Sequence, residues 1–323
     1  LAGPGNELQL LEDVPKAWDA WNIGLTGVRY PTRFRRMEIV ERGPVRSILR
    51  LRHTYLKPGV QRDAPTEDFP TSFFTQDIIL YDGVDRIDFV TNADWWEDKT
   101  MVKVGFQVAV QDSAATYEIP FGTIRRSTGN TTSQERAQIE VPSHRWADLS
   151  AADYGVSLLN RAKYGYDIKG NTMRLSLLRS PKWPDPTADR GTHKIEYALV
   201  PHEGSWQKDN TVRRGYEYNA PLIAILTDRH RGKGPASLEF FGFRGDGLVL
   251  TSIKKSEAEN AWIVTWYNSS GQQQVAEMTM PAPPRSIHRS NVLEEEVEPV
   301  QVRGRTVRLA TPPHALTIAR INW

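Results

Sequence analysis

Short segments in which every second side chain is apolar dominate this chain, and they constrain its fold more than any other feature. In residues 102–110 apolar side chains alternate with polar or small ones, and residues 49–55 repeat the pattern. A period of two is typical of a strand that lays one face on a core. Residues 78–81 and 86–90 flank Asp82-Gly83, a dipeptide that accepts the positive φ of a hairpin turn. The pattern therefore predicts antiparallel β-structure.

Helical patterns are weak. Only residues 148–153 and 220–226 are short helical candidates, and the second is apolar enough to be a strand instead. The 23 glycines and 21 prolines separate many short strands. This arrangement favours an all-β sandwich architecture.

Composition and charge exclude several classes of protein. The 323 residues are 39% hydrophobic, enough for a large core in one or two domains. No run reaches the ~18 apolar residues that cross a bilayer, and the polar start is no signal peptide, so we expect no membrane anchor. A net charge of +2 without a basic block argues against nucleic-acid binding. The chain has no cysteine, so neither disulfides nor a thiolate zinc site is expected. The compartment, cytoplasmic or periplasmic and secreted, stays open.

A domain boundary is expected near residues 229–235, where charge, glycine and proline replace the apolar pattern. We therefore predict a large domain over residues 1–228 and a small one over 235–323. The strands expected in the small domain are residues 248–253, 262–267, 306–309 and 315–321.

Several motifs resemble the carboxy-terminal half of glycoside hydrolase family 38 α-mannosidases. The residues that carry the resemblance follow one another in the family's order: 5–10, 18–21, 117–122, 154–167, 177–181 and 189–193. The resemblance implies a large supersandwich resembling galactose mutarotase, followed by a smaller β-sandwich. It also implies service in a retaining, zinc-dependent enzyme that hydrolyses terminal α-mannosyl linkages.

The same resemblance places the zinc and both catalytic carboxylates in an amino-terminal catalytic domain that is not among these residues. We therefore expect no catalytic residue and no metal ligand here, and no activity from the chain alone. Its expected partners are that catalytic half and a mannose-containing glycan. The sequence leaves homo-oligomerisation open.

The first candidate substrate contacts lie in the segment Asp189-Arg190-Gly191-Thr192-His193. It follows a loop rich in proline and aspartate and precedes an apparent strand over residues 194–199. The resemblance implies that Asp189, Arg190, Gly191 and His193 reach the sugar pocket from the β half. Arginine offers planar donors for vicinal hydroxyls, and glycine lets backbone approach a ligand. The alternative is a structural loop whose Asp189 and Arg190 pair with neighbours.

Tyr117 and Glu118 are the second candidates. The resemblance implies a tyrosine hydroxyl that faces the substrate, and a phenol can stack on a sugar while its hydroxyl binds a ring substituent. Alternatively, Tyr117 is an ordinary strand residue and Glu118 pairs with Arg125 or Arg126.

We expect the histidines and tryptophans of this chain to have structural roles. The histidines lack metal-ligand spacing, which argues against a metal site of their own. For Trp18, Trp21, Trp95, Trp96 and Trp146 we favour core or domain-interface packing over sugar stacking. The scattered histidines are His53, His144, His193, His202, His230, His288 and His314.

Two other functions stay open. A free-standing mutarotase-like epimerase could use His193 and Glu118 as acid and base. A noncatalytic carbohydrate-binding or assembly module would bind mannosides without turnover.

Overall fold

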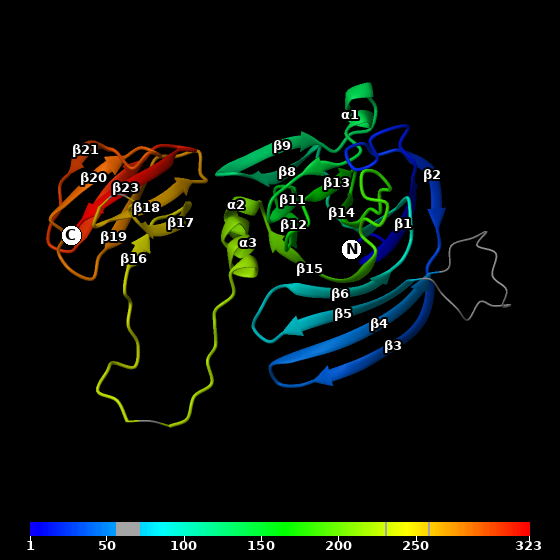
Figure 1. The fold of residues 1–323 in the computed structure, drawn as a ribbon, viewed down its shortest axis with the longest axis horizontal. Helices are drawn as coiled ribbons and strands as arrows, with labels where there is room; N and C mark the ends of the chain where they lie inside the picture. The colour runs from blue at the N-terminus through cyan, green and yellow to red at the C-terminus, as the bar shows by residue number, and fades with distance from the viewer. Residues whose placement is uncertain (56–71, 230, 258) are drawn as a thin grey trace. The chain divides into compact units, whose positions relative to one another are not determined.

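The chain divides into two compact units (Figure 1). The computed structural model describes residues 1–55, 72–229, 231–257 and 259–323. The larger unit comprises Leu1–Glu118 and Ile124–Asn219, and the smaller one comprises Ile119–Thr123 and Ala220–Trp323. Position 230, inside the expected boundary segment, lies outside the described residues.

The larger unit contains two antiparallel sheets. The six-stranded sheet has the order β10-β13-β14-β7-β1-β2, and the nine-stranded sheet has the order β3-β4-β5-β6-β15-β12-β11-β8-β9. The first is built from β1 (Glu7–Asp13), β2 (Leu25–Tyr30), β7 (Thr100–Gln107), β10 (Val141–Pro142), β13 (Gly165–Lys169) and β14 (Thr172–Leu178). The second is built from β3 (Arg33–Arg42), β4 (Arg46–Tyr55), β5 (Ser72–Tyr81), β6 (Ile87–Trp95), β8 (Ala114–Ile119), β9 (Gly122–Ser127), β11 (Trp146–Ser150), β12 (Tyr154–Asn160) and β15 (Gly191–Glu203).

Alternation along β7 explains how the two sheets share a core. Val102, Val104 and Phe106 are buried in the main hydrophobic cluster, as the sequence predicted for a strand with one apolar face. Lys103 is also buried, on the opposite face, where its ammonium lies 3.3 Å from the Glu140 carboxylate. A charged side chain can be buried there because it has an ionic neighbour.

The predicted hairpin around Asp82-Gly83 is confirmed. Strands β5 and β6 pair antiparallel with Leu80 opposite Ile87, and Gly83 has φ +68°. The adjacent strand β15 contains the expected strand over residues 194–199.

Both helical candidates were wrong. Residues 148–150 belong to β11, and residues 220–226 are neither helix nor strand. The pattern missed α3, in which Val212, Gly215 and Tyr218 form one buried stripe at helical spacing. The described helices are α1 (Ser133–Ala137), α2 (Trp206–Asp209) and α3 (Thr211–Asn219). Along the described residues, no helix has the length and apolar character needed to cross a membrane.

The smaller unit is a β-sandwich with its own core. Val264, Trp266, Met278, Leu309 and Ile321 are buried in one cluster. The predicted all-β fold, with a large sandwich followed by a smaller one, is confirmed. The three-stranded sheet of the smaller unit contains β16 (Gly242–Arg244), β19 (Gln274–Thr279) and β22 (Thr306–Thr311). Its five-stranded sheet contains β17 (Leu248–Lys255), β18 (Ala261–Asn268), β20 (Ser286–Ser290), β21 (Glu296–Val300) and β23 (Leu316–Asn322).

Candidate functional site

The loop between β14 and β15, residues 179–190, is fastened at its base by Arg179. The Arg179 Nε donates to the Asp13 carboxylate at 2.8 Å, and its terminal nitrogens donate to the carbonyl oxygens of Ala20 and Asn22. Asp13 in turn accepts a hydrogen bond from the Gly24 amide at 2.7 Å. These bonds tie the loop to the segment that follows β1.

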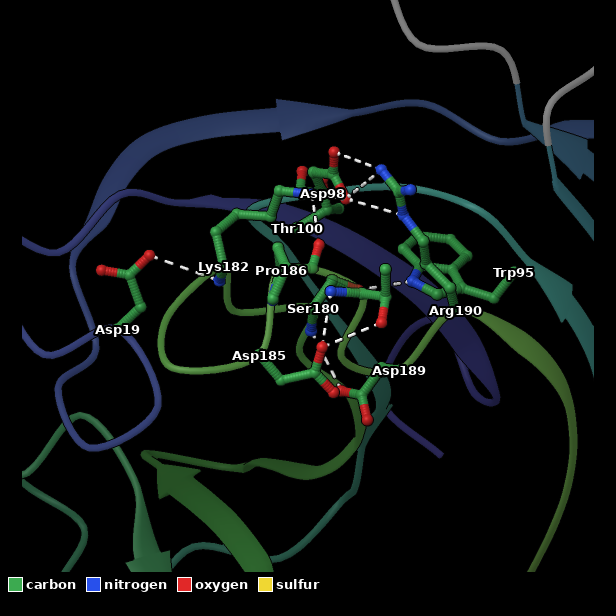
Figure 2. Close-up of polar contacts among 11 residues, drawn as sticks. Asp19, Trp95, Asp98, Thr100, Ser180, Lys182, Asp185, Pro186, Asp189 and Arg190 are labelled. Carbon is green, nitrogen blue, oxygen red and sulfur yellow. Dashed lines mark hydrogen bonds and ion pairs between the residues drawn. The ribbon is translucent and has the colours of Figure 1, made fainter.

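Asp189 closes the loop on itself. Its Oδ2 accepts hydrogen bonds from the backbone amides of Arg179 and Ser180, at 2.9 and 3.0 Å. Figure 2 shows Asp189 beside Ser180. The buried Ser180 has φ +57°, and its hydroxyl accepts a 2.5 Å hydrogen bond from the Trp95 indole. The Asp189 carboxylate therefore positions the loop, which is the structural role considered as the alternative.

Arg190 forms the exposed polar cluster of the loop together with Asp98 and Lys182. The Arg190 Nε and Nη2 lie 3.1 and 2.8 Å from Asp98 Oδ1, and Nη2 lies 2.7 Å from Oδ2 (Figure 2). The Lys182 ammonium lies 2.8 Å from the same carboxylate, and about a third of each side chain is exposed. Burial would raise the pKa of Asp98, but the hydrogen bonds and charges of Lys182 and Arg190 outweigh it and lower that pKa. The cluster thus has a net positive charge, because two cations, Lys182 and Arg190, surround the single Asp98 carboxylate. It places hydrogen-bond donors beside an acceptor.

Gly191 and His193 extend this loop into β15. Gly191 has φ +122°, and a Cβ built there would meet no atom within 4 Å. Its backbone conformation alone therefore requires glycine, whatever approaches it. The His193 Nε2 lies 2.8 Å from the Asp189 carbonyl oxygen.

Tyr117 and Glu118 lie in the buried part of β8. Tyr117 is 1% exposed, packs edge-on against Tyr166 and has the Arg126 guanidinium 4.7 Å from its ring centre. The Glu118 carboxylate accepts hydrogen bonds from the Arg145 amide at 2.7 Å and from its guanidinium at 2.9 Å. Burial raises the pKa of Glu118 although Arg145 opposes the shift. The considered pairing of Glu118 with Arg125 or Arg126 was wrong.

Strand register keeps the two groups of candidates apart. Tyr117 pairs with Ala147, Ala147 with Leu158, and Leu158 with Leu199. Gly191 precedes Leu199 by eight residues on β15. Three strand spacings across the sheet and eight residues along it separate them by ~25–30 Å. The structure therefore brings Asp189, Arg190, Gly191 and His193 together, and it does not bring Tyr117 and Glu118 to them.

Three exposed tryptophans surround the base of the loop. The rings of Trp18 and Trp21 lie 4.8 and 5.4 Å from Trp183, centre to centre. The expected core packing is confirmed for Trp95 and Trp146, which are buried. Trp18, Trp21 and Trp96 are 60%, 66% and 54% exposed, so for them packing at a domain interface stays a prediction. The segment of Trp18 and Trp21 is held by a 3.2 Å hydrogen bond from the Ala20 amide to the Trp183 carbonyl oxygen.

The sequence pattern missed Asp98, Lys182 and Trp183. Asp98 is 92 residues from Arg190 along the chain, so no local spacing links the two. Of the residues near Asp98, the sequence singled out only Trp95 and Trp96, for which we expected core or domain-interface packing.

Two models of known protein families match this chain. Residues 1–187 match the model described as "Glycosyl hydrolases family 38 C-terminal domain". Residues 247–318 match "Glycosyl hydrolases family 38 C-terminal beta sandwich domain".

Named relatives are similar along nearly the whole chain. Alpha-mannosidase 2C1 of Mus musculus is 33% identical over 96% of this chain and 31% of its own length. Alpha-mannosidase G of Dictyostelium discoideum is 33% identical over 90% of this chain and 26% of its own length. The chain thus spans between a quarter and a third of the length of these relatives.

A solved structure shares the fold. The crystal structure of an alpha-mannosidase from Enterococcus faecalis V583 matches 97% of this chain and 38% of its own, with TM-score 0.78 and 16% identity. From the two family models and the relatives, we conclude that this chain belongs to glycoside hydrolase family 38 and corresponds to its carboxy-terminal region.

Proposed function

We propose that this chain is the carboxy-terminal region of a retaining, zinc-dependent α-mannosidase that hydrolyses terminal α-mannosyl linkages. Membership of the family and the names of the relatives support this proposal. In it, the chain walls the substrate pocket and stabilises an amino-terminal catalytic region, which supplies the zinc and the nucleophile. The chain alone is then inactive.

The cluster of Arg190, Asp98 and Lys182 is the observation that carries the role of this chain in the pocket. Its guanidinium and ammonium are donors, its carboxylate is an acceptor, and all three are partly exposed. Vicinal hydroxyls of a sugar need donors and acceptors of this kind at short spacing. Arg190 is therefore the proposed substrate contact, with Lys182 beside it.

The neighbouring residues hold this contact in place. Asp189 and Arg179 fix the base of the loop, and Gly191 allows the backbone turn into β15. A contact that is already ordered costs less conformational entropy when the substrate binds. Tyr117 and Glu118 are proposed to hold β8 in the sheet, because both are buried among protein partners.

The residues that the structure describes contain no set of side chains that could bind a metal ion. Among residues 1–55, 72–229, 231–257 and 259–323, no group of three or more histidine, cysteine, aspartate or glutamate side chains could hold an ion. Zinc usually takes three or four such ligands.

Activity on mixing tests the proposal. We expect no hydrolysis of a chromogenic α-mannoside by this chain with added zinc, and hydrolysis when it is mixed with the amino-terminal region. Arg190→Lys keeps the charge but removes the planar fork, so kcat/KM of the mixture should fall about 10- to 100-fold, as for the loss of a charged hydrogen bond.

Arg86→Lys is the matched control. Arg86 makes the same two-pronged ion pair, with Asp88 at 2.5 and 3.0 Å, away from the loop. The Arg86→Lys variant should leave kcat/KM of the mixture unchanged, and its melting temperature should be similar to that of Arg190→Lys. Turnover by the chain alone, or equal losses for both variants, would refute the proposed role.

A further inference from the structure

Strands β5, β6 and β15 lie side by side in the nine-stranded sheet (Figure 1). The outer face of the sheet has a groove over these three strands. Its cavity volume is about 490 Å³, within the range of small-molecule sites. The inward residues of these strands, such as Phe74, Ala93 and Ile195, belong to the core. Because side chains alternate along a strand, the intervening residues point into the groove.

Strand register arranges these outward side chains in two rows. Phe73 pairs with Asp94, and Asp94 with Thr192. In the next row Asn92 lies between Thr75 and Lys194. Neighbouring strands are ~4.8 Å apart, so each row places three side chains within reach of one small ligand.

The polar groups of the groove are largely uncommitted. Within the described part of the chain, the side chains of Thr75, Asn92 and Thr192 make no hydrogen bond, and Asn92 and Thr192 are exposed. The next row on the same face is different, because Arg50 and Asp77 bind each other at 2.7 and 2.8 Å. The groove thus presents hydroxyls and an amide that a ligand can use as donors and acceptors.

Two exposed aromatic rings flank the Asp94 end. Phe73 is 46% exposed and Trp96 is 54% exposed. The Trp96 indole donates a 2.6 Å hydrogen bond to Asp94 Oδ1, which orients the carboxylate and leaves Oδ2 without a described partner. An aromatic ring can cover an apolar ligand face while the polar row binds its edge.

The charge of the groove favours a neutral ligand. The Lys194 ammonium is 2.6 Å from the Glu196 carboxylate, so it is already paired. Asp94 is then the one unpaired charge among the groove-lining residues that the structure describes. A single carboxylate among hydroxyl and amide groups suits a polyhydroxylated neutral molecule better than an anion.

We propose that this groove binds a neutral pyranose, with Asn92, Asp94 and Thr192 on its hydroxyls and Phe73 or Trp96 against its apolar face. The proposal goes beyond the α-mannosidase function, because none of Arg190, Asp98 and Lys182 lines the groove and binding needs no turnover. It defines a second sugar site on the surface of the large unit.

The Trp96 indole N–H reports on the groove directly. In a ¹H–¹⁵N spectrum of this 323-residue chain, assigned with Trp96→Phe, its peak should shift saturably when methyl α-D-mannopyranoside is added. Asn92→Ala should weaken this binding about fivefold, the effect of losing one hydrogen bond. Asn130→Ala, another exposed asparagine, is the matched control and should bind as the original chain does.

Each outcome decides the proposal. A saturable shift that Asn92→Ala weakens and Arg190→Lys leaves unchanged supports the groove. The absence of a shift at millimolar sugar would overturn the proposal. A shift that is lost in Arg190→Lys would also overturn it, because the sugar would then bind at the loop and not in the groove. Because turnover is not measured, failure of the α-mannosidase proposal leaves this result interpretable.

Discussion

At the scale of single residues, charged groups of the large unit, buried or partly exposed, find their partners far along the chain. Arg179 binds Asp13 across 166 residues, and Arg190 binds Asp98 across 92. Buried polar atoms need such partners, because leaving one unpaired costs free energy. The loop candidates could be named from the sequence, but Asp98 could not, since nothing local to Arg190 identifies it.

His202 and Asp148 form a buried pair that should make stability depend on pH. The His202 Nε2 lies 2.8 Å from Asp148 Oδ2, and both side chains are 1% exposed. Burial would lower the pKa of His202, but the hydrogen bond to Asp148 and the charges of Asp148 and Asp209 raise it above its usual value. A raised folded-state pKa contributes stability that is complete below about pH 6.5 and is lost as pH rises through the folded pKa.

We therefore expect His202→Gln to lower the free energy of unfolding by about 1–3 kcal/mol more at pH 5.5 than at pH 8.5. Urea unfolding at both pH values measures the difference. His314→Gln is the control, because the His314 side chain is exposed and makes no ion pair in the part of the chain that the structure describes. An equal loss at both pH values would show that the pair is not ionised in the folded state.

At the scale of elements, strands were more predictable than helices. The alternation of apolar and polar residues correctly indicated β4, β7, β18 and the β5–β6 hairpin. A strand with one face on a core has an apolar side chain at every second position, and this pattern can be seen in the sequence. The helices are short, and helices of this length depend on packing rather than on their own propensity. In α3 that packing is visible as the approach of Gly215 to the Trp146 ring.

The β5–β6 turn gives a prediction at this scale. Gly83→Ala should destabilise the chain by about 1 kcal/mol, because φ +68° disfavours any Cβ although there is space for one. Gly43→Ala, at the β3–β4 turn, is the control: its φ lies outside the left-handed region, and its nearest contact would be an ordinary 3.5 Å. Thermal or urea unfolding of both variants measures the effect, and equal stabilities would contradict the argument.

At the scale of the whole molecule, the described chain has two cores and two compact units. Between α3 and β16, residues 220–229 and 231–241 contain no helix or strand. The expected domains, 1–228 and 235–323, remain a proposal about where each unit ends.

Limited proteolysis tests that proposal. Brief trypsin treatment should cut first after Arg229, Arg231 or Lys233, which are exposed and outside regular structure. Mass spectrometry should then find two fragments that resist further digestion, because each contains a core of its own. First cuts inside β-strands of the large unit would contradict this division.

The sequence alone determined the all-β class, the positions of several strands, the hairpin at Gly83 and the family resemblance, because these depend on local periodicity, turn residues and motif order. Tertiary structure alone decided which side chains meet. It separated Tyr117 and Glu118 from the loop, joined Asp98 and Lys182 to Arg190, and created the groove beside Asn92. The physical reason is that strand register and loop closure bring together residues about 20 to 170 positions apart, and no short-range pattern records those encounters.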